Sequence, residues 1–268
     1  MYGDIWGFET DRLFTKDDFN ADGSYKEGIA SQVGLEQNGF VYGPGDIKFK
    51  DLDGDGIIDG GKKSENGGPG PGTLENHGDL KVIGNTTPRY QYSFRLGANW
   101  KGFDIDAFFQ GVGKRDVWST GAFVIPMSRG ADAIYENQTD YWSDENQDAN
   151  AYYPRMWATN ANKGTISVLE GGNHNFYPQS RYLVNMAYLR FKNLTIGYTL
   201  PKELSKKAYM EKVRIYFSAN NICELINKSN APVDPEINSQ ETAEPTNGTW
   251  GRIDPMYRTV SFGLQVTF

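Results

Sequence analysis

One acidic segment carries the residue types with the clearest chemical potential. Asp51, Asp53, Asp55 and Asp59 fall at relative positions 1, 3, 5 and 9, with a glycine at position 6. This is the spacing of the first part of a calcium loop, where the glycine permits a sharp turn and a backbone carbonyl, here that of Ile57, serves at position 7. Because converging carboxylates repel one another without a cation, the segment predicts a Ca²⁺ site.

The same segment departs from a complete EF-hand loop. Position 12 is Lys62, where that loop carries a bidentate glutamate. A helix-loop-helix hand is therefore not expected. A weak calcium site is one interpretation, and an acidic, solvated turn that binds no ion tightly is the other.

A second candidate site is a group of aromatic residues within one long segment. The functional hypothesis is a platform on which a sugar or a peptide stacks, because aromatic rings combine apolar faces with polar edges. The alternative is that these rings pack the segment into a small folded cap. The candidate substrate-binding residues are Trp118, Tyr141, Trp142, Tyr153 and Trp157.

Composition and motifs argue against other classes of function. A net charge of -7 makes nucleic acid an unexpected partner, since phosphate binding needs a clustered basic face. The one cysteine, Cys223, excludes an intrachain disulfide framework and a multi-cysteine zinc site. No nucleophile, base and orienting group lie together in sequence, so we do not expect an enzyme.

The elements that must position these sites are strands. From Tyr257 to Phe268, every even residue from Val260 onward is apolar and the odd residues are polar or glycine. Because a strand turns successive side chains to opposite faces, this segment has one apolar and one polar face. Similar alternation predicts strands over 90–100, 103–113, 185–200 and 212–222, and a less regular one within 1–13.

Two local features refine the predicted strands. Near Lys192 and Asn193 the apolar residues change from odd to even positions, which indicates a β-bulge or a membrane boundary. Lys101-Gly102 is a tight-turn dipeptide between two strands, and the connection after Pro201 is also short. Long connections cover 14–88, 114–182 and 226–256.

This arrangement predicts an all-β, antiparallel up-and-down meander rather than two packed sheets. Short turns at one end and long loops at the other are typical of outer-membrane β-barrels. A mean hydropathy of -0.61 and 38% hydrophobic residues argue against a transmembrane helix. The first residues carry no signal peptide, so we expect the chain to be part of a longer protein.

Several sequence blocks, in order, make the chain similar to a known family. It resembles the C-terminal part of the SusC/RagA-type, TonB-linked (TonB-dependent) outer-membrane proteins of Bacteroidetes. The most specific block is Tyr188 to Pro201 (YLRFKNLTIGYTLP). The other similar blocks lie at 45–59 (GDIKFKDLDGDGIID), 83–90 (IGNTTPRY), 103–113 (FDIDAFFQGVG) and 141–155.

The resemblance implies a barrel of about twenty-two strands with an internal plug, in the cell outer membrane. It also implies a SusD-like surface lipoprotein as a partner, energy from TonB, and oligosaccharides or peptides as cargo. Residues 1–268 would then be the C-terminal portion of the barrel, without the plug and with outer-membrane lipid around it. The alternative is a secreted, calcium-binding, β-rich module for carbohydrate or peptide. Exposure of the apolar strand faces as one band favours the membrane protein, and a second sheet packed on them favours the module.

Overall fold

The computed structural model describes residues 2–36, 40–61, 73–119, 121–126, 134–156, 174–236 and 254–268. Strands dominate these residues, with one short α-helix and four 3-10 turns among them. The strands are β1 (Asp4–Phe8), β2 (Thr10–Leu13), β3 (Ile47–Phe49), β4 (Leu80–Asn85), β5 (Gln91–Trp100), β6 (Phe103–Val112), β7 (Asp116–Val117), β8 (Val184–Asn185), β9 (Tyr188–Thr199), β10 (Lys212–Asn227) and β11 (Thr259–Thr267). The helix is α1 (Lys202–Lys207), and the 3-10 turns are Lys16–Asp18, Val33–Leu35, Glu136–Gln138 and His174–Phe176.

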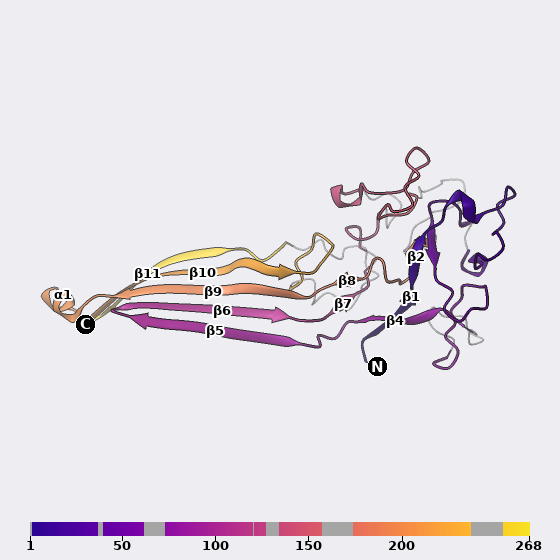
Figure 1. Ribbon diagram of the computed structural model, residues 1–268. Coiled ribbons are helices and arrows are strands. Elements are labelled where there is room, and N and C mark those ends of the chain that lie inside the picture. The colour runs from indigo at the N-terminus through magenta and orange to yellow at the C-terminus, as the bar shows by residue number, and fades with distance from the viewer. Residues whose placement is uncertain are drawn as a thin grey trace.

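The five long strands form one antiparallel sheet in the order β11-β10-β9-β6-β5. Each strand therefore pairs with the next long strand along the chain, which confirms the predicted meander. In Figure 1 the β5–β6 turn, α1 and the C-terminus lie at one end of this sheet, and the long connections lie at the other. The predicted separation of short turns from long loops is thus confirmed.

The turn between β5 and β6 follows from its two residues. Lys101 has φ 48° and Gly102 has φ 88°, so both central residues are left-handed. A type I′ turn needs this conformation, and its twist matches that of the flanking strands. The turn places Trp100 opposite Phe103 and keeps the ten residue pairs of the hairpin in one unbroken register.

The change of parity near Lys192 is a β-bulge. Asn193 pairs with Phe108 and Phe191 pairs with Phe109, so Lys192 is the extra residue of β9. Because one extra residue exchanges the two faces, the odd residues before the bulge and the even residues after it share the same side of the sheet.

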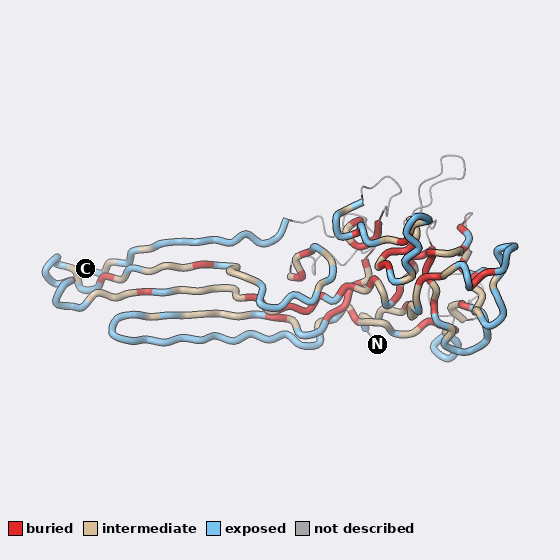
Figure 2. Tube along the Cα trace, turned by 45° about the horizontal axis from the view of Figure 1, so that its top comes forward, coloured by how far each residue is buried: buried red, intermediate tan, exposed pale blue. Residues whose placement is uncertain are grey.

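The buried core lies in the long connections and not in the sheet. Figure 2 shows the buried residues concentrated at the loop end, whereas β5 is exposed along its whole length. We call this part, the described residues of 2–85 and 115–187, the loop body. Its core includes Phe8, Leu13, Phe14, Phe40, Ile47, Phe49, Ile58, Val117, Ile125, Phe176, Tyr182, Val184 and Met186.

Three small sheets organise the loop body, pairing β1 with β4, β2 with β3 and β7 with β8. The strand expected within residues 1–13 is present as β1 and β2, which pair outside the large sheet. Side chains complete these short ladders. The amide of Gln32 donates to the Ile47 carbonyl at 3.0 Å and accepts from the Phe49 N–H at 2.7 Å, so it continues the pairing of β3.

Candidate functional site

One face of the large sheet is apolar across all five strands. Phe94 pairs with Phe109 and Phe109 with Phe191, and their rings stack with centroids 4.7 and 4.5 Å apart. Near the other end Phe103 pairs with Tyr198, with ring centroids 4.5 Å apart. Exposed members of this face include Leu96, Trp100, Ile105, Ile196, Ile215, Val260, Phe262 and Leu264.

The exposure of this face distinguishes between the two hypotheses that the sequence left open, the outer-membrane barrel and the secreted module. A soluble protein covers an apolar sheet face with a second layer, but within the described chain these side chains remain open. From Gln91 to Trp100, β5 rises about 30 Å, which a tilt of about 40° reduces to about 23 Å of height. That height matches the lipid-facing band of an outer-membrane barrel, so the face favours the membrane protein.

The opposite face of the sheet is polar and carries ion pairs between strands. The Arg95 Nε atom lies 2.6 Å from Asp106 Oδ2, which joins β5 to β6. The guanidinium of Arg214 on β10 donates to Asp104 on β6 through Nε at 3.0 Å and Nη2 at 2.5 Å. The alternation seen in sequence thus separates lipid-compatible side chains from charged ones, as the wall of a water-filled barrel requires.

A charged cluster lies on the polar face where the sheet meets the loop body. Arg190 is 4% exposed and contacts Asp234 at 2.8 Å, Glu236 at 2.9 Å and also Glu224. Lys192 reaches the second oxygen of Glu236 at 2.8 Å. These contacts fasten the segment that follows β10 onto the polar face of β9.

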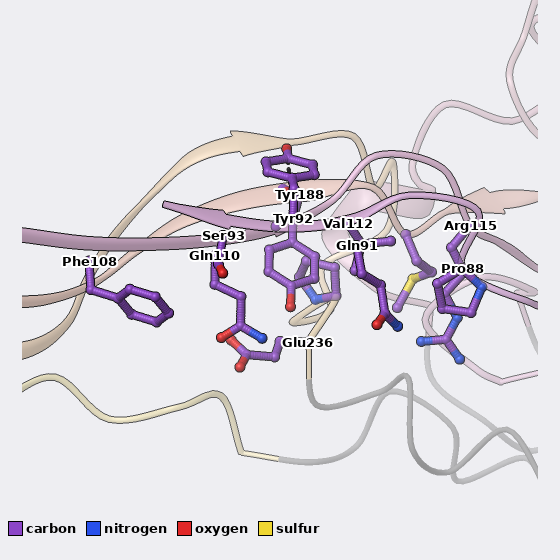
Figure 3. A pocket seen from close by; sticks show the side chains of 13 residues that line it. Pro88, Gln91, Tyr92, Ser93, Phe108, Gln110, Val112, Arg115, Tyr188 and Glu236 are labelled. Atoms are coloured by element: carbon purple, nitrogen blue, oxygen red, sulfur yellow. Dashed lines mark hydrogen bonds between the residues drawn. The ribbon is translucent and has the colours of Figure 1, made fainter. Parts of the chain in front are cut away.

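A cavity of about 540 Å³ opens beside this cluster. Gln91, Ser93, Gln110 and Tyr188 line it, with Arg115 and Glu236 among the charged residues of its wall. Figure 3 shows the amides of Gln91 and Gln110 on the side of the strands where Glu236 lies. Amide and hydroxyl groups around an aromatic ring can hydrogen-bond a neutral polar molecule, such as a peptide backbone or a sugar, on the inner face of the sheet.

The acidic segment brings together part of its predicted set. Asp51, Asp53 and Asp55 each offer a carboxylate oxygen, and these atoms lie within 4.8 Å of one another. The Asp51 carboxylate also accepts from the N–H groups of Gly54 at 2.6 Å and Gly56 at 2.9 Å. Oxygen-only donors of this kind suit Ca²⁺ better than Zn²⁺.

The other two predicted ligands, Asp59 and the carbonyl of Ile57, are not part of this cluster of carboxylates. Asp59 lies outside the cluster of three carboxylates, and its Oδ1 accepts from the Gly61 N–H at 2.6 Å. Ile57 is 49% exposed and donates its N–H to Asp55 Oδ1 at 2.8 Å. The cluster of Asp51, Asp53 and Asp55 is therefore the part of the predicted site that the fold assembles.

A residue that the sequence analysis did not predict, Asp79, holds this loop through hydrogen bonds to its backbone. Asp79 is fully buried, and its carboxylate accepts from the N–H groups of Leu52 at 2.6 Å and Asp59 at 2.9 Å. Burial raises the pKa of Asp79; the two backbone hydrogen bonds oppose that rise and the nearby charge of Asp53 adds to it. No spacing rule connects Asp79 to the acidic motif, so only the fold reveals this contact.

The aromatic segment forms part of the core of the loop body. Trp142 is 4% exposed and Tyr153 is 3% exposed, while Trp118 and Tyr141 are partly buried against the same core. The Trp142 ring lies over Gly45, where an added Cβ would be 2.3 Å from ring atoms. Trp157 lies outside the described residues. A substrate-binding role for the five residues stays a prediction, and among the four that the structure describes only Trp118 and Tyr141 are partly exposed.

A buried polar centre joins the connections to one another. Asp46 is fully buried and accepts from Arg155 Nη2 at 2.7 Å, Asn175 Nδ2 at 2.8 Å and the Gly43 N–H at 2.9 Å. Sequence reasoning did not find this centre, because its members come from three separate segments.

Comparison with known proteins supplies the context for this geometry. No family model matches the chain. The TonB-dependent receptor P3 of Formosa agariphila is 27% identical over 271 residues, which cover 99% of this chain and 22% of the receptor. The chain therefore spans about a fifth of the length of that relative.

Solved structures share the fold. The RagAB peptide importer in its open-open state matches with a TM-score of 0.54 and 17% identity, covering 99% of this chain and 22% of the matched one. The RagAB peptide transporter gives a TM-score of 0.54 at 16% identity, covering 100% of this chain and 23% of the other.

The described residues contain no helix that is long and apolar enough to cross a membrane. The five-stranded sheet is open, with β5 and β11 at its two edges. The sequence match to a TonB-dependent receptor and the fold match to RagAB agree with its exposed apolar face. Together they agree with the resemblance stated from the sequence: the chain is similar in sequence to part of a TonB-dependent receptor and shares the fold of the matched part of RagAB.

Proposed function

We propose that the chain forms the C-terminal strands and extracellular loops of a TonB-dependent importer that takes up oligosaccharides or peptides. The observation that carries this proposal is the sheet itself, with a continuous exposed apolar face on one side and a charged, cavity-bearing face on the other. Such a sheet is a wall between lipid and an aqueous interior.

The proposal also covers the cargo and the partners of the importer. RagAB is named as a peptide importer, which favours peptides over sugars for a related barrel. The amides of Gln91 and Gln110 could pair with the backbone of a peptide passing along the polar face. A SusD-like lipoprotein would meet the loop body at the cell surface. TonB would act through a part of the whole protein outside this chain.

The test uses the full-length protein in its own membrane. A strain that lacks it should lose growth on peptides or oligosaccharides supplied as the sole nutrient, and removal of TonB should have the same effect. Gln110→Ala should raise the substrate concentration needed for half-maximal uptake. The control is Gln265→Ala. Gln265 lies opposite Arg214 in the register of β10 and β11, and it does not line the cavity. Undiminished growth on both nutrient classes without the protein would contradict the proposal.

We further propose a weak calcium site at Asp51, Asp53 and Asp55. The convergence of their carboxylates supports it, and an ion there would relieve their mutual repulsion. Its role would be to hold the loop around residues 51–59 in a single conformation. The buried carboxylate of Asp79 already accepts hydrogen bonds from the backbone of this loop. Without a glutamate at position 12, the expected dissociation constant is roughly 10⁻⁴ to 10⁻³ M.

A further inference from the structure

A basic rim borders the end of the sheet that carries the short turns. The two short connections at this end carry four exposed lysines against two glutamates, Glu203 and Glu211, and Lys212 at the start of β10 is exposed beside them, in a chain whose net charge is -7. Within the described chain, none of these lysines forms an ion pair. The four are Lys101 of the β5–β6 turn and Lys202, Lys206 and Lys207 of α1.

Exposed apolar side chains continue from the sheet into this rim. Trp100 is 68% exposed, and Lys101 Nζ lies 5.0 Å from the centre of its ring. Beyond β9, Leu204 is 53% exposed and Tyr209 is 93% exposed. Figure 1 places α1 beside the C-terminus, where Phe268 is 89% exposed. The apolar face therefore ends in aromatic side chains that are mixed with lysines.

The fold fixes the height of this rim along the barrel wall. The Ser205 hydroxyl is buried and contacts the carbonyls of Lys202 at 3.2 Å and Glu211 at 3.4 Å. The Glu211 N–H donates to the Thr267 carbonyl at 2.8 Å, which fastens the connection to β11. Tyr209 has a left-handed φ of 59°, a conformation that is unfavourable for a tyrosine. Its ring is nevertheless exposed.

We propose that Lys101 and the connection from Lys202 to Glu211 bind the anionic phospholipid headgroups of the periplasmic membrane leaflet. The short turns of such barrels face the periplasm, so this end meets the phospholipid side of the outer membrane. Lysines next to an apolar surface extend their charge to the headgroup layer while their stems contact the acyl region. Each basic residue near an anionic surface adds an electrostatic attraction that falls off within a Debye length.

The lysines of the rim and its continuity with the apolar face of the sheet favour an anionic phospholipid over a soluble polyanion. The rim adjoins the face already assigned to lipid, and its exposed Leu204 and Tyr209 would lie at the boundary between acyl chains and headgroups. A soluble polyanion would use the lysines but would leave these two side chains in water. The proposal depends on the barrel's place in the membrane and is independent of the imported cargo.

The experiment measures lipid retained by the purified full-length protein. Native mass spectrometry would follow phosphatidylglycerol and phosphatidylcholine carried from mixed micelles. We expect Lys202→Gln/Lys206→Gln/Lys207→Gln to lower retention of phosphatidylglycerol about tenfold or more, since three charges are removed. The arginine variant Lys202→Arg/Lys206→Arg/Lys207→Arg should retain it, which separates charge from packing.

The matched control replaces three exposed lysines at the loop end, Lys16→Gln/Lys26→Gln/Lys228→Gln. It removes the same charge away from the periplasmic leaflet and should leave retention unchanged. Heat-modified mobility of each variant on gels reports whether the barrel is folded. Equal retention by the α1 variant and the wild type would overturn the proposal. So would equal retention of phosphatidylcholine and phosphatidylglycerol by the wild type.

Discussion

Arg214 and Asp104 form their ion pair across an intervening strand, over a residue that has no side chain. Asp104 lies on β6 and Arg214 on β10, and Gly197 of β9 lies between them. A Cβ at Gly197 would lie 2.5 Å from both Arg214 Nη2 and Asp104 Oδ1. The glycine therefore lets a charged bridge cross the polar face close to the backbone.

Gly197→Ala should destabilise this part of the large sheet. The added methyl displaces the ion pair, and overpacking of this kind costs about 1–3 kcal/mol. Gly97→Ala is the matched control, because a Cβ there meets its nearest neighbours at 3.5 and 3.7 Å, which is ordinary contact. The temperature of the folded-to-unfolded gel shift, measured on the full-length protein, should fall for the first variant alone. Equal shifts in both would show that the ion pair is not held by this glycine.

Calcium should bind at the acidic loop and fail to bind when two of its ligands are removed. Calorimetric titration of the wild type should give heats with a millimolar-range midpoint, roughly 10⁻⁴ to 10⁻³ M. Asp53→Ala/Asp55→Ala should give none and should leave the strands intact. Asp59→Ala should bind as the wild type does, since Asp59 lies outside the cluster. Identical heats from wild type and double variant would leave the solvated turn as the correct interpretation.

The segment near Asp18 should lose stability in acid. Burial of Asp18 opposes its ionisation, but hydrogen bonds from Arg12 and Thr15 outweigh it and lower its pKa from 3.8 to about 2. A pKa lowered on folding stabilises the fold above the unfolded-state value, and this stability is lost as pH falls from about 4 to about 2. After allowance for screening, the loss is on the order of 1–2 kcal/mol.

Hydrogen exchange of residues 10–30 at a series of pH values would measure this loss. Asp18→Asn should be less protected than the wild type at pH 6 and nearly equal to it at pH 2. The control Asp17→Asn changes an exposed neighbour and should keep the wild-type profile. A wild-type profile that does not change between pH 4 and pH 2 would contradict the role given to Asp18.

The chain expressed by itself should associate in water. Its sheet has two edges, at β5 and β11, each with unpaired backbone groups, and its apolar face is exposed. Light scattering should report large assemblies in plain buffer and smaller particles in detergent. A monodisperse monomer in plain buffer that unfolds cooperatively would count against the barrel.

The sequence by itself determined the strands, their meander and their two faces. These depend on local rules: a period of two places Val260 and Phe262 on one face, and Lys101-Gly102 sets a register through its own dihedral preferences. The change of parity at Lys192 was also visible in the sequence, where it indicated a β-bulge or a membrane boundary, and the strand register shows that it is a bulge. The resemblance to a family rests on the same locally ordered blocks.

Only the tertiary structure decided which polar and aromatic residues of the long connections meet. Arg155 and Asn175 reach Asp46 across 109 and 129 positions of sequence, and Asp79 supports a loop that begins at Asp51. Trp142 likewise lies over Gly45 and is buried, whereas its sequence context left both an exposed platform and a folded cap open. Such contacts depend on how distant loops pack, and no periodicity encodes them. The strands follow from local geometry, and the sites in the loops follow from packing between segments that are far apart in the chain.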